Sequence, residues 1–107
     1  MANICERFEE YKMKEAHKLL TECGFTRIYT GGGHSAWARF FPNAHVMVSQ
    51  DATAELEPQY MADCGISVGA FCDETEAQMY GETCHSYAAL PRLLLEAFAA
   101  AVDYRSE

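Results

Sequence analysis

The segment FTRIYTGGGHSAWARFF, residues 25–41, decides the fold of this chain. Residues 25–30 and 35–41 each alternate between two sets of side chains, which is the pattern of a half-buried β-strand. The three consecutive glycines between them tolerate positive φ angles and suit a tight reversal. Trp37 and Arg39 are two residues apart in the second strand and therefore share one face. The segment predicts a β-hairpin that further antiparallel strands can extend.

An amphipathic helix is expected before the hairpin, over Asn3–Cys23. Asn3 can cap its first turn, and Glu6 can reach back to complete a capping box. Apolar side chains recur along the segment at spacings of three and four residues, which places them on one face. Gly24 follows at the position where a left-handed C-terminal cap is expected.

Three further strands and a second helix are expected after the hairpin. The strands are expected at residues 45–50, 65–72 and 76–83, the last showing the weakest alternation. The second helix is expected over Leu90–Tyr104. Pro91 fits its first turn, where a missing N–H group is harmless.

Together these elements predict an α+β fold in which residues 1–107 form one domain. Because the connections between neighbouring strands are short, we expect an antiparallel meander of four or five strands. The two helices each carry an apolar stripe, so both are expected to pack on one face of the sheet. The other face would then be open to water or to a partner.

A long block without basic residues dominates the charge pattern. Between Arg39 and Arg92 lie 52 residues, of which none is lysine or arginine and eight are acidic. This block accounts for the whole formal net charge of −8. A surface of one sign attracts cationic partners and accelerates their encounter. The candidate partner-binding carboxylates, which we expect to converge on one side of the fold, are Asp51, Glu55, Glu57, Asp63, Asp73, Glu74 and Glu76.

Direct binding of nucleic acid is not expected, because proteins that bind its anionic backbone bring clustered lysine and arginine. Lys12, Lys14 and Lys18 are close in sequence, but acidic residues surround them. No apolar run approaches the ~20 residues of a membrane-spanning helix. No cationic segment leads into an apolar one at the start of the chain, so no export signal is expected. These observations favour a cytoplasmic protein without a membrane partner.

The cysteines indicate reduced thiols rather than a disulfide framework or a metal site. There are five, an odd number with irregular spacing, at positions 5, 23, 64, 72 and 84. Zinc sites usually show close pairs such as C-x-x-C, and the chain has none. Cys64, Cys72, Cys84 and His85 remain the most plausible alternative ligand set. We expect neither a metal nor a cofactor.

For each motif that could be catalytic, the sequence favours a structural role. Phosphate-binding loops join a strand to a helix and the nucleotide type adds a lysine, whereas the glycine turn here precedes a strand and has no lysine. Cys84 and His85 could pair as nucleophile and base, but adjacent residues in a strand point to opposite faces. Asp73 and Glu74 fall in a turn, where solvation is the simplest interpretation. We therefore expect no enzymatic activity.

Aromatic residues offer a second candidate binding surface. Most of these rings are expected in the core, but Trp37, beside the glycine turn, is expected to be partly exposed and available to a partner. The residues considered are Tyr29, Trp37, Phe40, Phe41 and Tyr60.

The run from Gly24 to Phe41 resembles a strand–glycine–strand pattern of small proteins from phages and other mobile elements. The matching residues are Tyr29, Thr30, Gly31, Gly32, Gly33, Ala36 and Trp37. The resemblance in layout covers residues 15–100, and it brings no catalytic residues. Small acidic proteins of this origin look like anti-CRISPR and other anti-defence inhibitors, many of which occupy a basic surface of their target.

Charge and resemblance together lead to one functional hypothesis and one alternative. The hypothesis is a non-enzymatic acidic inhibitor that binds a host nucleic-acid-handling complex, with a CRISPR effector as the suspected partner. Its carboxylates would occupy a basic surface in place of phosphates. The alternative is a small adaptor or assembly subunit that binds a protein partner through the open face of the sheet.

Overall fold

A computed structural model describes residues 4–103 of the chain, and the side chains of residues 10–102. Two helices, five strands and two short 3₁₀ turns follow one another along the sequence. In chain order they are α1 (Ile4–Glu22), β1 (Thr26–Gly31), β2 (His34–Phe40), β3 (Ala44–Ser49), η1 (Pro58–Tyr60), β4 (Ile66–Cys72), β5 (Gln78–Cys84), η2 (Tyr87–Ala89) and α2 (Leu90–Asp103).

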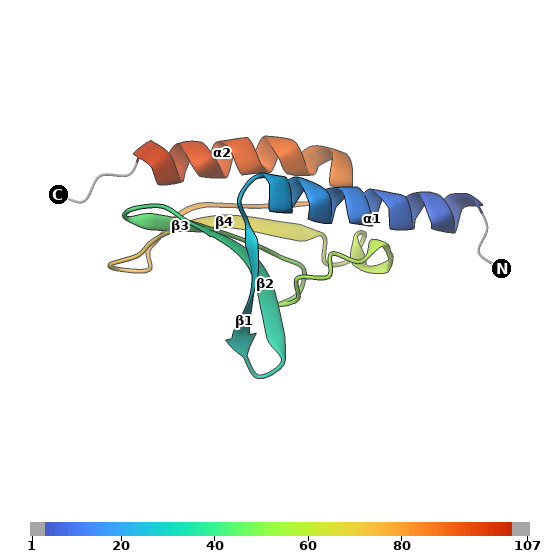
Figure 1. Ribbon diagram of the computed structural model, residues 1–107, viewed down its shortest axis with the longest axis horizontal. Coiled ribbons are helices and arrows are strands. Elements are labelled where there is room, and N and C mark those ends of the chain that lie inside the picture. The colour runs from blue at the N-terminus through green and yellow to red at the C-terminus, as the bar shows by residue number, and fades with distance from the viewer. Residues whose placement is uncertain (1–3, 104–107) are drawn as a thin grey trace.

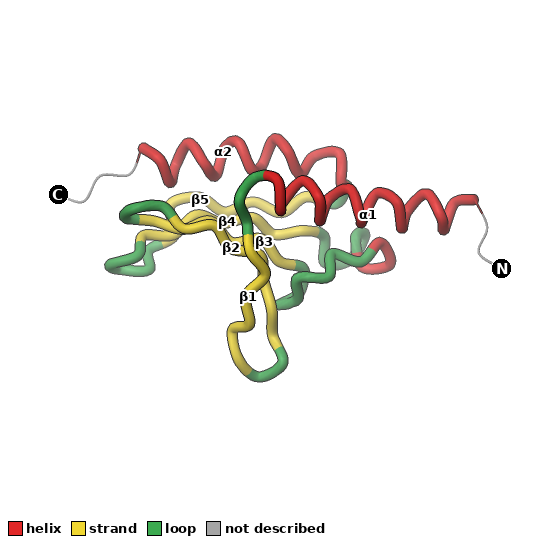
Figure 2. The backbone as a smooth tube through the Cα atoms, viewed as in Figure 1, coloured by secondary structure: helices red, strands yellow, loops and turns green. Residues whose placement is uncertain are grey.

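The five strands form one antiparallel sheet in the order β1-β2-β3-β4-β5. Figure 1 shows α1 and α2 on the same face of this sheet, and Figure 2 shows the β1–β2 hairpin extending away from both helices. The α+β fold, the meander and the two helices on one face are therefore confirmed. The weakest predicted strand is present as β5. Asn3 and Tyr104, expected at the helix ends, lie outside the described residues.

The end of α1 shows why the hairpin starts where it does. Gly24 has a φ angle of 89°, in the left-handed region that favours glycine. The N–H of Phe25 donates to the carbonyl of Leu20 at 2.9 Å, and the N–H of Gly24 donates to that of Thr21 at 3.1 Å. These two bonds form a Schellman cap. The predicted cap is confirmed, and it turns the chain from α1 directly into β1.

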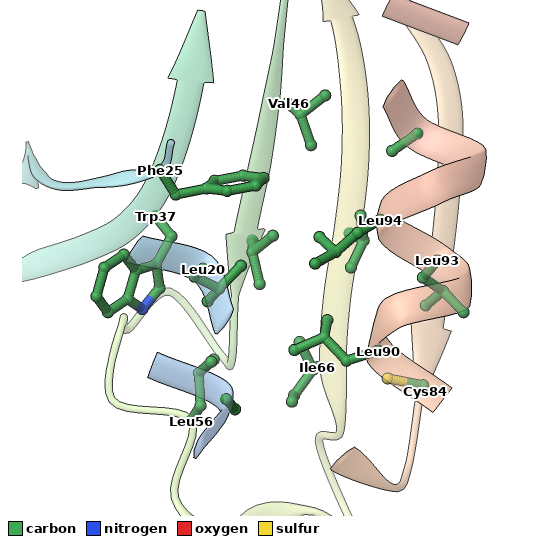
Figure 3. Packing of buried hydrophobic residues seen from close by; sticks show 14 of the residues in the cluster. Leu20, Phe25, Trp37, Val46, Leu56, Ile66, Cys84, Leu90, Leu93 and Leu94 are labelled. Carbon is green, nitrogen blue, oxygen red and sulfur yellow. The ribbon is translucent and has the colours of Figure 1, made fainter. Parts of the chain in front are cut away.

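The core lies between the helices and one face of the sheet (Figure 3). Side chains of β3 and β4 alternate, and those that face the helices are almost fully buried. Each such aliphatic side chain contributes about 1.5–3 kcal/mol relative to exposure. Strand and helix residues with 2% exposure or less include Val46, Val48, Ile66, Val68, Leu90, Leu93 and Leu94.

The segment between β3 and β4 is buried although it is irregular. Ala54 and Leu56 are fully buried, so the backbone groups around them need hydrogen-bond partners within the protein. Side chains supply these partners to four consecutive carbonyls. The indole N–H of Trp37 donates to Ala54 at 2.7 Å, Nε2 of His17 to Glu55 at 2.7 Å, the hydroxyl of Tyr87 to Leu56 at 2.5 Å, and Nε2 of Gln50 to Glu57 at 3.0 Å.

This arrangement overturns the expected exposure of Trp37. The indole is only 7% exposed, because α1 and the 54–57 segment cover the face that Trp37 shares with Arg39. The ring of His17 lies 5.5 Å from it. Among the aromatic residues considered above, the exposed ones are instead Tyr29 at 81%, Phe40 at 64% and Tyr60 at 46%.

The side-chain nitrogen and oxygen of Gln50 both form hydrogen bonds with the backbone of the 54–57 segment. Its Nε2 donates to the Glu57 carbonyl, and its Oε1 accepts from the Glu57 N–H at 2.7 Å. Gln50→Ala should therefore reduce the free energy of unfolding by about 1–3 kcal/mol, because buried backbone groups lose their partners. Gln59→Ala is the matched control, since Gln59 is exposed and its amide donates to the Glu57 carboxylate rather than to the backbone. Equal losses in urea unfolding of the two variants would contradict this role for Gln50.

A hydrogen bond between Tyr80 and Glu96 ties β5 to α2. The phenol donates to the Glu96 carboxylate at 2.6 Å. Partial burial, and then the bond to Glu96 and its charge, raise the pKa of the Tyr80 phenol above its ordinary value. The unfolded phenol ionises at a pKa of about 10, whereas the folded phenol keeps its proton to higher pH.

The stabilisation from Tyr80 should therefore be complete below pH about 10 and should fall as the pH rises further. At neutral pH, Tyr80→Phe should lower the free energy of unfolding by roughly 1 kcal/mol. The difference between wild type and Tyr80→Phe should be constant up to pH about 9 and should shrink between pH about 10 and about 12. Denaturant unfolding across that range measures it, and a constant difference would argue against the coupling to Glu96.

Candidate functional site

The face of the sheet that the helices leave open has three rows of side chains running across the strands. Strand register defines each row, because paired residues lie side by side on the same face. The row next to the β4–β5 turn is aromatic and comprises Phe40, His45 and Phe71, continued by Gln78. The central row comprises Ala38, Met47, Gly69 and Gly81, and the hydroxyl row comprises Ser49, Ser67 and Thr83.

The aromatic row is a stack of three rings from three neighbouring strands. The ring centroids of Phe40 and His45 are 5.7 Å apart, and those of His45 and Phe71 are 5.5 Å apart with nearly parallel planes. Nδ1 of His45 donates to the Asp73 carboxylate at 2.6 Å, which fixes the imidazole between its neighbours. Phe40 is the most exposed of the three rings. The row therefore offers a fixed apolar surface at one end of the open face.

The central row forms a hollow beside the aromatic row. Gly69 and Gly81 are paired across β4 and β5, so two adjacent strands lack side chains at this point. The Phe71 ring leans over Gly69, where an added Cβ would lie 2.8 Å from ring carbons. The hollow has a volume of ≈ 610 Å³, and the hydroxyl row lines its far side. A side chain at Gly69 would fit only if the Phe71 ring, two residues along the same strand, moved aside.

The basic residues of the sheet are committed to the opposite face. Arg39 donates to the Cys23 carbonyl at 2.8 Å, and its guanidinium lies over the rings of Phe41 and Phe98. Arg27 lies 5.3 Å from the Trp37 ring centroid and 3.3 Å from the Glu55 carboxylate. Among the described strands, the open face thus carries neither lysine nor arginine.

The expected convergence of the acidic residues is wrong. Residues 51–63 precede β4, whereas residues 73–76 follow it, so the two groups lie at opposite ends of the same strand (Figure 1). A seven-residue strand spans roughly 20 Å. The block that is continuous in sequence therefore forms two separate acidic surfaces.

The two acidic groups also differ in their surroundings. In the first group, Glu55 pairs with Arg27, and Glu57 accepts a bond from the Gln59 amide at 3.3 Å. Asp51 and Asp63 are exposed. The second group, Asp73, Glu74 and Glu76, is exposed and follows Phe71 directly along the chain. Only this second group borders the aromatic row.

Cys84 and His85, considered above as a nucleophile and base, have separate surroundings in the structure. Cys84 is buried in the core, which raises the pKa of its thiol. Nδ1 of His85 instead bonds the Met61 carbonyl at 2.8 Å, so the two side chains do not form a nucleophile–base pair. The three glycines form the β1–β2 turn, with φ angles of 98°, 59° and 81°. Cys23, Cys64, Cys72 and Cys84 are not in disulfide bonds, and no group of three metal-ligating side chains occurs within the described region.

No protein-family model, curated protein or solved structure matches this chain. The described helices include none that is long and apolar enough to cross a membrane.

Two residues of the aromatic row, His45 and Phe71, were not predicted from the sequence as site residues. They lie 26 positions apart in sequence, and only strand register brings them together. The available signal was alternation: Val46 and Val48 face the core, so His45 must face away from it.

Two substitutions distinguish the buried Trp37 ring from the exposed Phe40 ring. Trp37→Phe should lower the free energy of unfolding by about 1–3 kcal/mol, because the buried Ala54 carbonyl loses its donor. Phe40→Ala should lower it by no more than about 1 kcal/mol, because most of the ring is already exposed. Urea unfolding of both variants measures the difference. A larger loss for Phe40→Ala would show that the aromatic row is a structural element rather than an available surface.

Proposed function

We propose that this protein is a non-enzymatic binding protein whose aromatic row and adjoining carboxylates engage a basic surface of a protein partner. The contact surface comprises Phe40, His45 and Phe71 together with Asp73, Glu74 and Glu76. The other acidic residues, at the far end of β4, contribute to attraction at long range. Trp37 has a structural role in this proposal.

One observation carries the proposal: the exposed Phe40 ring, the half-buried rings stacked beside it and the carboxylates adjoin each other on a face with no described lysine or arginine. Aromatic side chains provide most of the affinity in many interfaces. Carboxylates steer a cationic partner towards them and raise the association rate. A guanidinium or ammonium group that reached this surface could also interact with the ring faces.

The partner class follows from charge. Basic protein surfaces that receive phosphates are common in complexes that handle nucleic acid, and carboxylates can occupy them in place of phosphates. Together with the resemblance to anti-defence proteins, this supports an inhibitor of a host nucleic-acid-handling complex, with a CRISPR effector as the specific candidate. Such an inhibitor would act in the cytoplasm.

The hollow favours a second candidate function, that of an adaptor or assembly subunit. In that case a partner side chain would enter the hollow between the Phe71 ring and the hydroxyl row, and apolar contact would dominate. Salt distinguishes the two functions, because ions screen exposed charges beyond about 8–10 Å. Capture of a partner from host lysate should weaken steeply with added salt in the first case and little in the second.

Charge reversal at the β4–β5 turn tests the leading proposal. Glu74→Lys/Glu76→Lys changes the net charge from −8 to −4, and it should slow association with the captured partner by roughly tenfold or more, measured by surface plasmon resonance. The control, Glu57→Lys/Asp63→Lys, makes the same change in net charge at the far end of β4. It should slow association less, because those charges are outside the contact surface.

Both double variants should unfold within about 1 kcal/mol of the wild type, since exposed ion pairs contribute little. If the two variants slow association equally, net charge alone matters and the proposed surface is wrong. If neither does, the acidic residues act only in solubility.

A further inference from the structure

The outer edge of the sheet at β1 is exposed and carries neither proline nor lysine, and a β-bulge lies near its end, between Tyr29 and Gly31. Every residue of β1 is exposed except Ile28, which is half-buried, and Tyr29 is the most exposed large apolar side chain described. Native edge strands are commonly blunted by proline, lysine or an inward-pointing charge. In β1 the only charged residue is Arg27, and its guanidinium is engaged by Trp37 and Glu55.

The ladder shows which backbone groups point outward. Ser35 donates its N–H to the Ala52 carbonyl at 2.9 Å, on the β3 side of β2. Because backbone direction alternates along an antiparallel strand, Ala36 and Ala38 point to β1 and bond Ile28 and Thr26. The N–H and C=O groups of Arg27 and Tyr29 therefore face away from the sheet. No hydrogen bond from the rest of the described chain reaches them.

We propose that two copies of this chain pair through β1, antiparallel, with Ile28 on the two-fold axis. In this register Arg27 of one copy faces Tyr29 of the other, and the two exchange backbone hydrogen bonds on each side of the axis. Ile28 meets Ile28 of the second copy, and Thr26 meets Thr30. The five-stranded sheets then join into one continuous sheet.

The strand is complementary to itself in this register. The Ile28 pair is a non-hydrogen-bonded pair, in which Cα atoms approach to about 4.5 Å and side chains are in close contact. Threonine pairs and aromatic contacts across strands are each favourable. The exposed Tyr29 ring gains a cationic neighbour in Arg27 of the second copy. No like charges face each other.

Charge also selects β1 as the place where a second copy can approach. The chain carries −8 overall, but its first 42 residues have six basic and five acidic groups. The acidic turn at residues 73–76 would repel a second copy, whereas β1 has no acidic residue. Five residue pairs bury less than the ~1,600 Å² of a standard stable interface. The dimer is therefore concentration-dependent.

Cysteine crosslinking tests both the dimer and its register. Under mild oxidation, Ile28→Cys should give a covalent dimer on a non-reducing gel, because the axis places the two thiols opposite each other within disulfide reach. Thr26→Cys alone and Thr30→Cys alone should not exceed the wild type, which controls for the native cysteines. A mixture of these two variants should crosslink. If Ile28→Cys crosslinks no more than the wild type, or if Thr26→Cys alone crosslinks as well, the proposal is wrong.

A second measurement does not depend on oxidation. Light scattering across a concentration series should show the wild type rising towards twice its mass of 12.0 kDa. Tyr29→Pro removes one outward N–H without removing a bond to β2, a position where edge strands tolerate proline. It should stay monomeric with an unchanged circular dichroism spectrum, whereas Tyr29→Val keeps the donor and should still dimerise. A wild type that is monomeric throughout would overturn the proposal.

Discussion

Burial of an irregular segment is the constraint on which the rest of this structure depends. The chain leaves β3 and crosses beneath α1 before it enters β4, and Ala54 and Leu56 are fully buried on the way. Backbone carbonyls without partners in such a place would be strongly destabilising. Donors from α1, β2, η2 and the end of β3 satisfy four carbonyls in a row. The segment thereby links four elements that are distant in sequence.

This constraint explains why several residues of types that are common in binding sites have structural roles here. Trp37, His17 and Tyr87 are residue types common in binding sites, yet each has its polar group directed at the 54–57 segment. Arg39 and Arg27 are likewise held on the helix-covered face by rings and a carbonyl. What remains for a partner is the face that these bonds do not use. Its rings and carboxylates are supplied by β2, β3, β4 and the turn after β4.

The fold separates acidic residues that are close in sequence. A block of one sign in sequence becomes two surfaces at the ends of β4, roughly 20 Å apart. This distance exceeds the screening length of about 8 Å in physiological salt, so the two surfaces act nearly independently at close range. Only the group at residues 73–76 adjoins exposed rings, and this adjacency makes it the better candidate for contact.

The sequence by itself determined the elements and their order. Alternation, glycine turns and apolar stripes are local signals, and they were sufficient for α1, the five strands, α2 and the cap at Gly24. Two helices with one apolar stripe each also required a single covered face of the sheet. Asp73 and Glu74, expected to be solvated in a turn, are exposed there.

Only the tertiary structure decided which of those residues share a surface. Register between strands places His45 beside Phe40 and Phe71, although no local pattern relates them. Burial of the 54–57 segment turns Trp37 into a donor to the core, because the cover over its face comes from residues far along the chain. Chain direction places the two acidic groups at opposite ends of β4. These are non-local relations, set by pairing and by the need to satisfy buried backbone groups, and a local reading of the sequence does not contain them.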